Sequence, residues 1–292
     1  MPCYAWLGRE WNIKKNILLI NDLPGYGKVA LAAMFPVLLH MGYSVYNLPT
    51  ALVSNTLDYG KFEILDTTDY MKNTVDVWEQ LGFSFGCIAT GFIVSEEQVR
   101  LITDYIARQR KKDKELYVVV DPIMGDDGVL YNGIDSRVVS YMRRLVGEAD
   151  VMIPNFTEAA FLSGCYLGKE TLNSDEIQHL LKELRKMTEG SVVVTSIAET
   201  GTGRHLVCGY DRKEDEYFTI PYQYIPVRFP GTGDIFSAVL TGNLLDGAQL
   251  SKAVKNAMDS VEILIKANAD NQDKYRGIPV EEDLSLLPRA TR

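Results

Sequence analysis

The sequence predicts an α/β fold with a mostly parallel central sheet and helices on both of its faces. Short apolar runs alternate with longer amphipathic segments along nearly the whole chain. The runs contain few polar residues, which is typical of strands covered on both faces. No linker-like, low-complexity or repeated stretch divides the 292 residues, so we expect one domain, 16–292, after a short extension, 1–15.

The apolar runs predict short strands rich in Val, Ile and Leu, at 17–20, 45–48, 87–90, 116–120, 151–153, 192–194, 206–210 and 217–220. The last two flank the turn 211–213, and we expect them to pair antiparallel. Helical periodicity predicts helices at 29–41, 69–81, 96–111, 135–145, 155–163, 174–187, 234–245 and 251–267. Gly42 and Gly82 follow two of these segments and are typical stop signals.

Composition narrows the class of function. The formal net charge of -9, from 30 basic and 39 acidic residues, argues against a general nucleic-acid or anionic-membrane surface. No apolar run reaches the roughly 18 residues of a membrane span, and residues 1–15 lack the apolar core of a signal peptide. The four cysteines are scattered without a CxxC pair, which fits reduced thiols. We therefore expect a cytoplasmic protein with no nucleic-acid or membrane partner.

Polar residues follow successive predicted strands. In an open parallel sheet the ligand lies beyond the carboxyl ends of the strands, so these residues are candidates for one binding edge. They are Asp22, Thr50, Thr90 with Gly91 and Phe92, Asp121, Asn155 with Glu158, and Thr195 with Ser196. Each one alone has a structural alternative as a helix cap, and Asn155 with Glu158 fits a capping box. Taken as a set, they favour a binding site.

The most informative motif is Gly231-Thr232-Gly233-Asp234, which opens an apolar run. A helix N-terminus with bare amides suits an anion, and an adjacent carboxylate suits removal of a proton. Phosphoryl transfer needs this combination. The alternative interpretation is that Asp234 only caps the helix.

Two other interpretations are weaker. The segment 25–30 matches G-x-G-x-x-A, as in a dinucleotide-binding fold, but no Asp or Glu lies between Val29 and Leu57 to hold a ribose. The three histidines, His40, His179 and His205, are far apart in sequence, so they support neither a catalytic triad nor a metal cluster. Base catalysis would then come from a carboxylate.

The chain resembles the ribokinase superfamily, and within it the pyridoxal (vitamin B6) kinases, from about residue 16 to about residue 267. The resemblance rests on motifs in the family's order: Tyr26-Gly27, 50–56 with Tyr59-Gly60, 90–92, 121–126, 154–158, 193–196 and 231–234. It implies a ribokinase-like fold and ATP-dependent phosphorylation of the 5′-hydroxymethyl group of a B6 vitamer, in salvage of pyridoxal 5′-phosphate. It also implies a homodimer.

The resemblance assigns roles around the transferred phosphoryl group. Asp234 matches the catalytic base that deprotonates the hydroxymethyl group. Gly231, Thr232 and Gly233 match the anion hole, and the last two also contact the nucleotide. The implied cofactors are ATP and Mg²⁺, and a monovalent cation such as K⁺ is a further one that the resemblance allows.

Further positions match the metal and nucleotide sites. Glu158 and Asp121 match acids near Mg²⁺ and the γ-phosphate. Asn155, Thr195 and Ser196 match contacts on the nucleotide side. The segment 209–219 resembles part of the region bordering ATP, although a solvated hairpin explains it equally well.

The substrate side of the resemblance shows departures. Thr50 matches a substrate-pocket hydroxyl, and the segment 55–68 resembles the flap over the substrate. Typical members carry Ser-His where this chain has Asp22-Leu23, and many carry tyrosine at the position of Phe92. We hypothesise that Asp22 pairs with a protonated ring nitrogen or an amine and favours pyridoxamine or pyridoxine.

Three alternatives stay open. The first is a kinase of another hydroxymethyl heterocycle or of a sugar. Hydroxymethylpyrimidine kinases often carry cysteine in place of Thr232 and a Gly-Gly-rich first loop, and neither is present. The second is a non-catalytic B6-binding protein, against which the retained Asp234 and Glu158 argue. The third is a nicotinamide dehydrogenase, which rests on the segment 25–30 alone.

Overall fold

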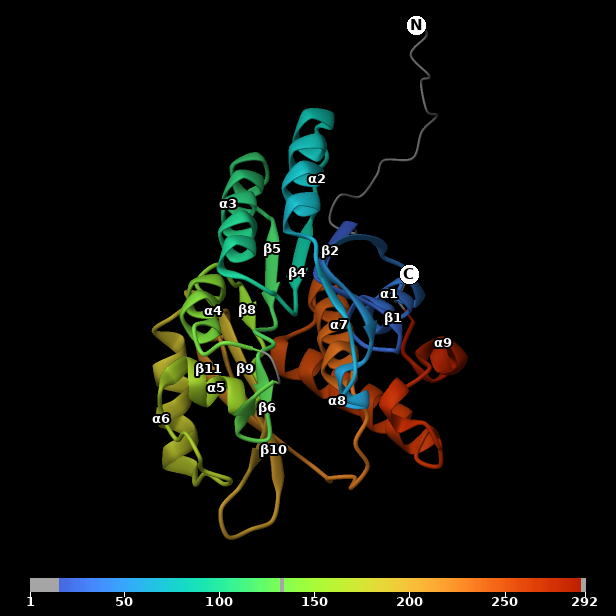
Figure 1. Ribbon diagram of the computed structural model, residues 1–292. Coiled ribbons are helices and arrows are strands. Elements are labelled where there is room, and N and C mark those ends of the chain that lie inside the picture. The colour runs from blue at the N-terminus through green and yellow to red at the C-terminus, as the bar shows by residue number, and fades with distance from the viewer. Residues whose placement is uncertain (1–15, 132–133, 290–292) are drawn as a thin grey trace, which may run out of the picture.

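The computed structural model describes residues 16–131 and 134–289 of the chain (Figure 1). The predicted extension 1–15 lies outside these residues. The described residues form one nine-stranded sheet in the order β11-β10-β9-β8-β5-β4-β1-β2-β3. Its centre is parallel from β2 to β9, and β3, β10 and β11 join antiparallel at the two edges. The predicted fold class is confirmed.

The strands of the main sheet are β1 (Asn16–Tyr26), β2 (Ser44–Asn55), β3 (Ile64–Asp66), β4 (Cys87–Thr90), β5 (Tyr117–Val120), β8 (Val151–Met152), β9 (Ser191–Ala198), β10 (His205–Asp211) and β11 (Glu216–Tyr222). A separate short hairpin consists of β6 (Gly125–Asp126) and β7 (Val129–Leu130). The helices are α1 (Ala30–His40), α2 (Thr68–Leu81), α3 (Glu96–Lys112), α4 (Val138–Val146), α5 (Phe156–Ser163), α6 (Ser174–Arg185), α7 (Thr232–Leu245), α8 (Leu250–Ala267) and α9 (Val280–Asp283).

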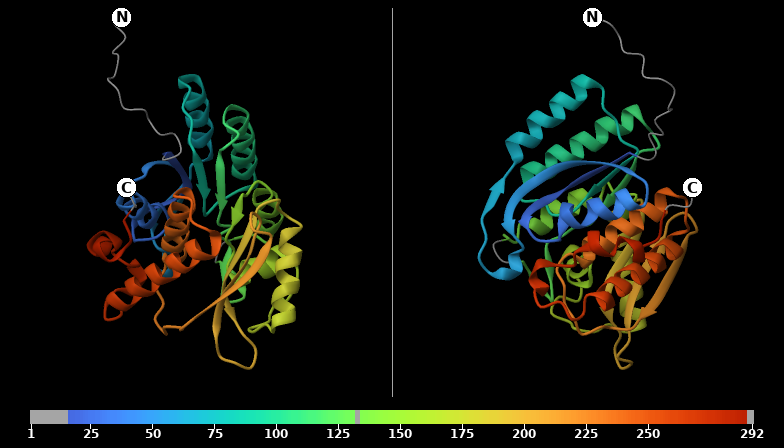
Figure 2. Two further views of the ribbon diagram at one scale, coloured as in Figure 1. Left: turned by 180° about the vertical axis from the view of Figure 1, so that it is seen from behind. Right: turned by 90° about the vertical axis from the view of Figure 1, so that its right-hand side faces the viewer.

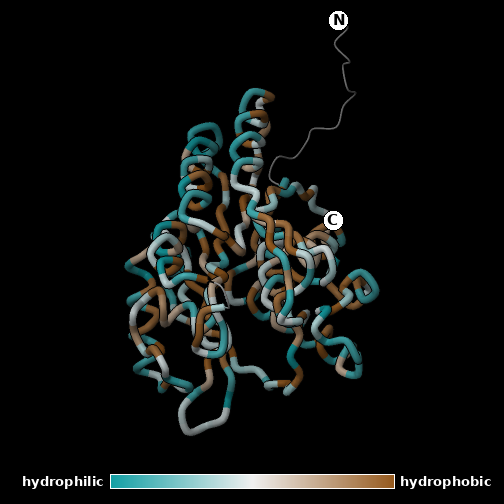
Figure 3. The backbone as a smooth tube through the Cα atoms, in the orientation of Figure 1, coloured by the Kyte–Doolittle hydropathy of each residue, from teal (hydrophilic) through white to brown (hydrophobic). Residues whose placement is uncertain are grey.

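Alternation along the strands divides the core into two layers. In β1, Leu18 and Ile20 face a layer with α2 to α6, whereas Ile17 and Leu19 face a layer with α1, α7 and α8. Figure 2 shows these two groups of helices on opposite sides of the sheet. Apolar residues concentrate along the central strands (Figure 3), which explains why the sequence showed runs rather than alternation.

Three strands extend further than the sequence predicted. β1 continues past Ile20 to Tyr26, β2 continues past Leu48 to Asn55, and β9 continues past Val194 to Ala198. Our prediction that Asp22, Thr50, Thr195 and Ser196 follow their strands was therefore wrong, because all four lie inside them. The parallel core still ends where predicted, since β1 pairs with β4 only from Ile17 to Ile20.

An irregularity marks the point where β1 leaves the core. The register between β1 and β2 shifts between Asn21 and Leu23, so that Thr50 and Ala51 lie opposite Asp22. A bulge of this kind redirects a side chain and increases the local twist. Beyond it, β1 and β2 continue as a ribbon with β3.

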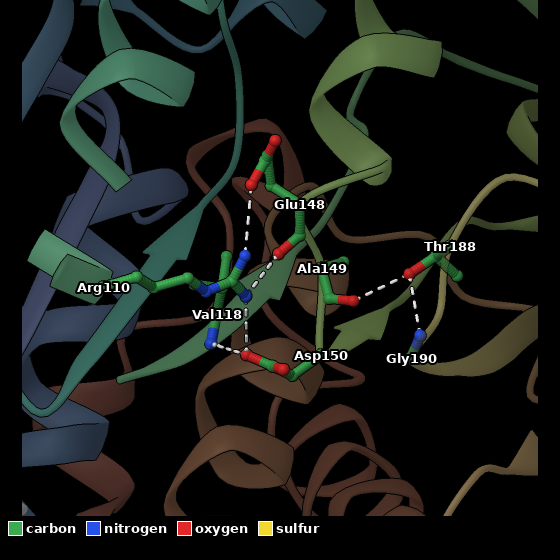
Figure 4. Close-up of polar contacts among 7 residues, drawn as sticks. All are labelled: Arg110, Val118, Glu148, Ala149, Asp150, Thr188 and Gly190. Carbon is green, nitrogen blue, oxygen red and sulfur yellow. Dashed lines mark hydrogen bonds and ion pairs between the residues drawn. The ribbon is translucent and has the colours of Figure 1, made fainter. Parts of the chain in front are cut away.

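At the amino ends of the central strands, a polar network joins β5 to the chain before β8 (Figure 4). Arg110 of α3 donates to the Glu148 carboxylate at 3.1 Å, to the Glu148 carbonyl at 2.8 Å and to Asp150 at 3.1 Å. The same Asp150 oxygen accepts the amide of Val118 at 2.7 Å. Asp150 therefore satisfies a buried strand amide as well as a cation.

No helix within the described ranges combines the length and apolarity needed to cross a membrane.

We expect Asp150→Ala to lower the free energy of unfolding by about 2 kcal/mol, because it leaves the buried Val118 amide without its acceptor. Glu148→Ala is the matched control. It removes one half-exposed ion pair and keeps the backbone carbonyl, so it should cost less than about 1 kcal/mol. Urea unfolding compares the two variants, and equal losses would contradict the role of the amide.

Candidate functional site

A cavity of about 1360 Å³ opens beyond the carboxyl ends of the parallel strands. A typical pocket for one small molecule holds about 300–1,000 Å³, so this cavity has room for two ligands side by side. All but one of the residues to which the family resemblance assigns a role, together with Asp22 and Phe92, line it: Asp22, Phe92, Asp121, Asn155, Glu158, Thr195, Ser196, Gly231, Thr232, Gly233 and Asp234. Residues separated by more than half of the chain are thus brought to one site.

Thr50 is the exception. Its side chain is fully buried, it is not part of the cavity wall, and its hydroxyl donates to the carbonyl of Phe92 at 2.7 Å. Its observed contact therefore supports the backbone of a wall residue rather than a substrate.

The N-terminus of α7 supplies free amides to the cavity. Gly231 precedes the helix with φ of 87°, and a Cβ there would lie 2.5 Å from the carbonyl oxygen of Lys28, so only glycine fits. Gly231 is the N-cap residue of α7, and no side chain caps this end of the helix. The first-turn amides of an α-helix have no acceptor within the helix, which leaves those of Thr232 and Gly233 available to an anion.

The interpretation of Asp234 as a helix cap is wrong, because its carboxylate turns away from its own helix. One oxygen accepts the amide of Ala30 at 2.8 Å, and the other accepts the side-chain amide of Asn21 at 3.2 Å. Ala30 has φ of 49°, an uncommon value for a residue with a side chain. Ala30, the first residue of α1, therefore adopts an unfavourable backbone conformation, and in this conformation its amide donates to Asp234.

The environment of Asp234 suits a general base. Burial raises the pKa of Asp234 to about 6, while the hydrogen bonds from Ala30 and Asn21 act in the opposite direction. The group is then mostly ionised at neutral pH, yet basic enough to accept a proton.

A second carboxylate, Asp22, lies in the same cavity. Burial and, to a lesser extent, the negative charge of Asp234 together raise the pKa of Asp22 to about 7. A cationic ligand group beside Asp22 would be favoured, because it would relieve this repulsion. Phe92, two residues beyond β4, lines the same cavity.

Asp121 and Glu158 form a third acidic group. Asn155 and Glu158 make the predicted capping box of α5, and Glu158 also accepts the amide of Met124 at 3.1 Å. Burial raises the pKa of both acids, and the charges of Glu158 and Asp234 raise that of Asp121 further. The capping role of Glu158 is therefore established by contacts, while its carboxylate still borders the cavity.

This acidic pair fits Mg²⁺. Across the ranges that the structure describes, no group of three or more His, Cys, Asp or Glu could hold a metal ion by itself. Mg²⁺ typically keeps several waters and takes only one or two carboxylates together with substrate phosphates. Two buried, mutually repelling carboxylates match that donor set.

The other end of the cavity is lined by aromatic residues. The rings of His205 and Tyr224 stack with centroids 4.7 Å apart, close to Thr195 and Ser196 on the cavity wall. The segment 221–228 borders the cavity, whereas 209–219 forms the β10–β11 hairpin and takes no part in the wall. The solvated-hairpin interpretation of 209–219 is therefore the better one.

Arg228 is a cavity residue that the sequence analysis missed. It lies three residues before Gly231, and it contacts Asp127 at 2.5 Å and Asp126 at 3.5 Å. Lys169 and Lys255 also line the cavity, and each is likewise paired with an acid, Glu176 and Asp259 respectively. Arg228 precedes the free amides of α7 by a few residues along the chain, and no motif in the sequence signalled it.

The predicted flap, 55–68, forms part of the cavity wall through Thr56, Leu57 and Asp58. The segment after α8 holds it in place. The hydroxyl of Tyr59 donates to Asp273 at 2.6 Å, and the hydroxyl of Thr56 donates to the carbonyl of Tyr275 at 2.6 Å. No local pattern in the sequence predicts this contact, because the two segments are more than 200 residues apart.

We expect Tyr59→Phe to raise the KM for the small-molecule substrate about threefold, because one hydrogen bond to a carboxylate stops holding the flap. Asp273→Asn should act similarly, and the double variant should lose less than the sum of the two. Steady-state kinetics measures this coupling. Tyr70→Phe, on the exposed face of α2, is the control. Additive losses would show that the contact does not hold the flap.

Comparison with known proteins places the chain in a family. The phosphomethylpyrimidine kinase family model matches residues 39–278, so the chain belongs to this family. Pyridoxal kinase of Arabidopsis thaliana is 29% identical over 266 residues, covering 87% of this chain and 82% of the relative. The pyridoxine/pyridoxal/pyridoxamine kinase of Bordetella avium is 29% identical over 246 residues, covering 82% and 81%.

Solved structures agree with these relatives. A Bacteroides thetaiotaomicron protein assigned as a phosphomethylpyrimidine kinase, crystallised with pyridoxal, has a TM-score of 0.88 and 33% identity, covering 95% of this chain and 97% of that one. Pyridoxal kinase of Leishmania donovani in complex with ADP has a TM-score of 0.82 and 26% identity, covering 94% and 97%. The ribokinase-like fold predicted from the sequence is confirmed.

Proposed function

We propose that this chain is an ATP-dependent kinase that phosphorylates the 5′-hydroxymethyl group of a vitamin B6 vitamer. The observation that carries the proposal is the position of Asp234, a buried and ionisable carboxylate beside the free amides of α7. Relatives named pyridoxal kinases and solved structures with pyridoxal or with ADP support both ligands. The size of the cavity suits the two together.

The residues define a direct transfer. Asp234 takes the proton of the hydroxymethyl group, and the freed oxygen attacks the γ-phosphorus. A new O–P bond forms as the bond to the β-phosphate oxygen breaks, and ADP leaves. The amides of Thr232 and Gly233 donate to the charge that gathers on the transferred group, and Arg228, which also lines the cavity, adds a cation.

Asp121 and Glu158 would hold Mg²⁺, which when bound neutralises phosphate charge. On the nucleotide side we assign Asn155, Thr195 and Ser196 to the polar wall of the ATP site. Asn155 already donates to the carbonyl of Gly125 at 2.8 Å, so it also fixes the β6–β7 hairpin against α5.

A cytoplasmic homodimer that needs K⁺ or another monovalent cation is a further part of the proposal, supported by the family resemblance alone.

We expect Asp234→Asn to lower kcat by at least about a thousandfold, because it removes the proposed base. The measurement is ADP release with pyridoxal, pyridoxine and pyridoxamine as acceptors. In the unchanged protein, kcat/KM should fall as the pH drops below about 6, where Asp234 becomes protonated. Turnover by purified Asp234→Asn that approaches the original rate would contradict the mechanism.

The second candidate substrate is a hydroxymethylpyrimidine, which the name of the matching family model favours. The same assay separates the two, because the acceptor with the higher kcat/KM is the substrate. Binding of a vitamer without ADP release would instead indicate a non-catalytic binding protein.

Asp22 sets the expected choice among vitamers. We expect Asp22→Ser to lower kcat/KM for pyridoxamine relative to pyridoxal about tenfold, because a charge-assisted bond to the amine or ring nitrogen is lost. Kinetics on the three vitamers measures the ratio. Phe92→Leu is the comparison variant, since it removes ring stacking and should weaken all three alike. An unchanged ratio in Asp22→Ser would refute the role of Asp22.

A further inference from the structure

Asn21 connects three parts of the site through one side chain. It is 1% exposed, and its Nδ2 donates to the Oδ1 of Asp234 at 3.2 Å. Its Oδ1 accepts the backbone amide of Phe92 at 2.8 Å and that of Asp22 at 3.0 Å. The base, the aromatic wall residue and the second carboxylate are therefore held by the same amide group.

The position of Asn21 explains why its side chain is free for this task. The pairing of β1 with β4 ends at Ile20, so the next residue lies where the two strands separate. Asn21 then occupies the gap and replaces the missing strand contact with side-chain hydrogen bonds to the amide of Phe92. Strand geometry alone would leave that amide without an acceptor.

Gly91 makes room for the amide group. A Cβ at position 91 would lie 2.4 Å from Nδ2 and 2.6 Å from Oδ1 of Asn21. Its φ is not in the left-handed region, so the requirement for glycine here is one of space. Asn21 and Gly91 thus form a fitted pair below the cavity floor.

Only a neutral group that both donates and accepts satisfies this position. A carboxylate would accept the two backbone amides but would repel Asp234, and an apolar side chain of similar size would leave all three partners unsatisfied. The orientation of the Asn21 amide follows from its partners, because two N–H groups face one end and a carboxylate faces the other.

We propose that Asn21 is a positioning residue for phosphoryl transfer, which fixes the carboxylate of Asp234 relative to Phe92 and Asp22. The inference rests on the proposed role of Asp234 as the base. It adds that the base and the substrate-facing wall are coupled directly, so that a displacement of either one moves the other.

The charges around Asp234 make this contact important. Asp22 in β1 and Asp121 in the loop after β5 interact electrostatically with Asp234, and so does the phenol of Tyr131. The amides of Ala30 and Asn21 are the groups that donate to it. Loss of the Asn21 donor would favour the protonated carboxyl and raise the pKa of Asp234.

The experiment compares Asn21→Leu, Asn21→Asp and Gly91→Ala with the unchanged protein. We expect Asn21→Leu and Asn21→Asp to lower kcat about tenfold or more, with the KM for ATP within about twofold. Gly91→Ala should reproduce the loss without altering Asn21, because it displaces the amide. In all three variants the acid limb of the pH profile of kcat should move to higher pH.

Asn268→Leu is the matched control. Asn268 is also buried and also donates to a carboxylate, that of Asp283 at 2.7 Å, but it lies outside the cavity wall. Its substitution should lower the melting temperature while kcat and the pH profile stay unchanged. A purely structural Asn21 would behave in the same way, so the shifted acid limb is the distinguishing result.

One result would contradict the role of Asn21, and a different result would contradict the role of Asp234 as the base. If Asp234→Asn is inactive but the folded Asn21 and Gly91 variants keep the original kcat and pH profile, the inference on Asn21 is wrong and the proposed function stands. If Asp234→Asn stays active, the assignment of the base is wrong. Should Asn21→Leu fail to fold, Asn21→Asp and Gly91→Ala decide the question, because Asn21→Asp keeps an acceptor for the two backbone amides and Gly91→Ala keeps Asn21 itself.

Discussion

The structure of the site depends on the burial of one carboxylate, that of Asp234. A buried carboxylate is stable only with hydrogen-bond donors around it, and here the donors come from Ala30 at the start of α1 and from Asn21 in β1. Asp234 itself lies in the first turn of α7. Two helix N-termini and the end of a strand therefore meet at one charged group, and their relative positions are fixed by it.

Close backbone packing holds α1, α7 and β1 together around Asp234. The carbonyl of Lys28 lies so near to Gly231 and Gly277 that a Cβ at either one would approach it within 2.5 to 2.7 Å. The amide of Lys28 donates to the carbonyl of Arg276 at 2.7 Å. The C-terminal segment thus packs against the turn before α1, and this packing holds the left-handed backbone of Ala30 in place.

The sequence predicted the parallel core and most of the cavity wall, because those features follow from local pattern. Cys87–Thr90 is a strand as expected, since its apolar residues are buried on both faces. The extensions of β1 and β2 beyond the core were missed because Pro24, Pro49 and several polar residues interrupt their apolar pattern. Asn21, Arg228 and the contact of Tyr59 with Asp273 depend on distant parts of the chain, and no local pattern encodes such partners.

Charge balance connects the chemistry to this architecture. Asp22, Asp121, Glu158 and Asp234 all border the cavity, and burial raises the pKa of each. A nucleoside triphosphate adds further negative charge, so it can enter only with compensating cations and donors, which Arg228 and the amides of α7 provide in part. Phosphate charge near Asp234 would favour its protonated form, whereas cations would favour the ionised form. Cations that would admit the nucleotide would therefore also favour the ionised form of Asp234, which our proposal requires of the base.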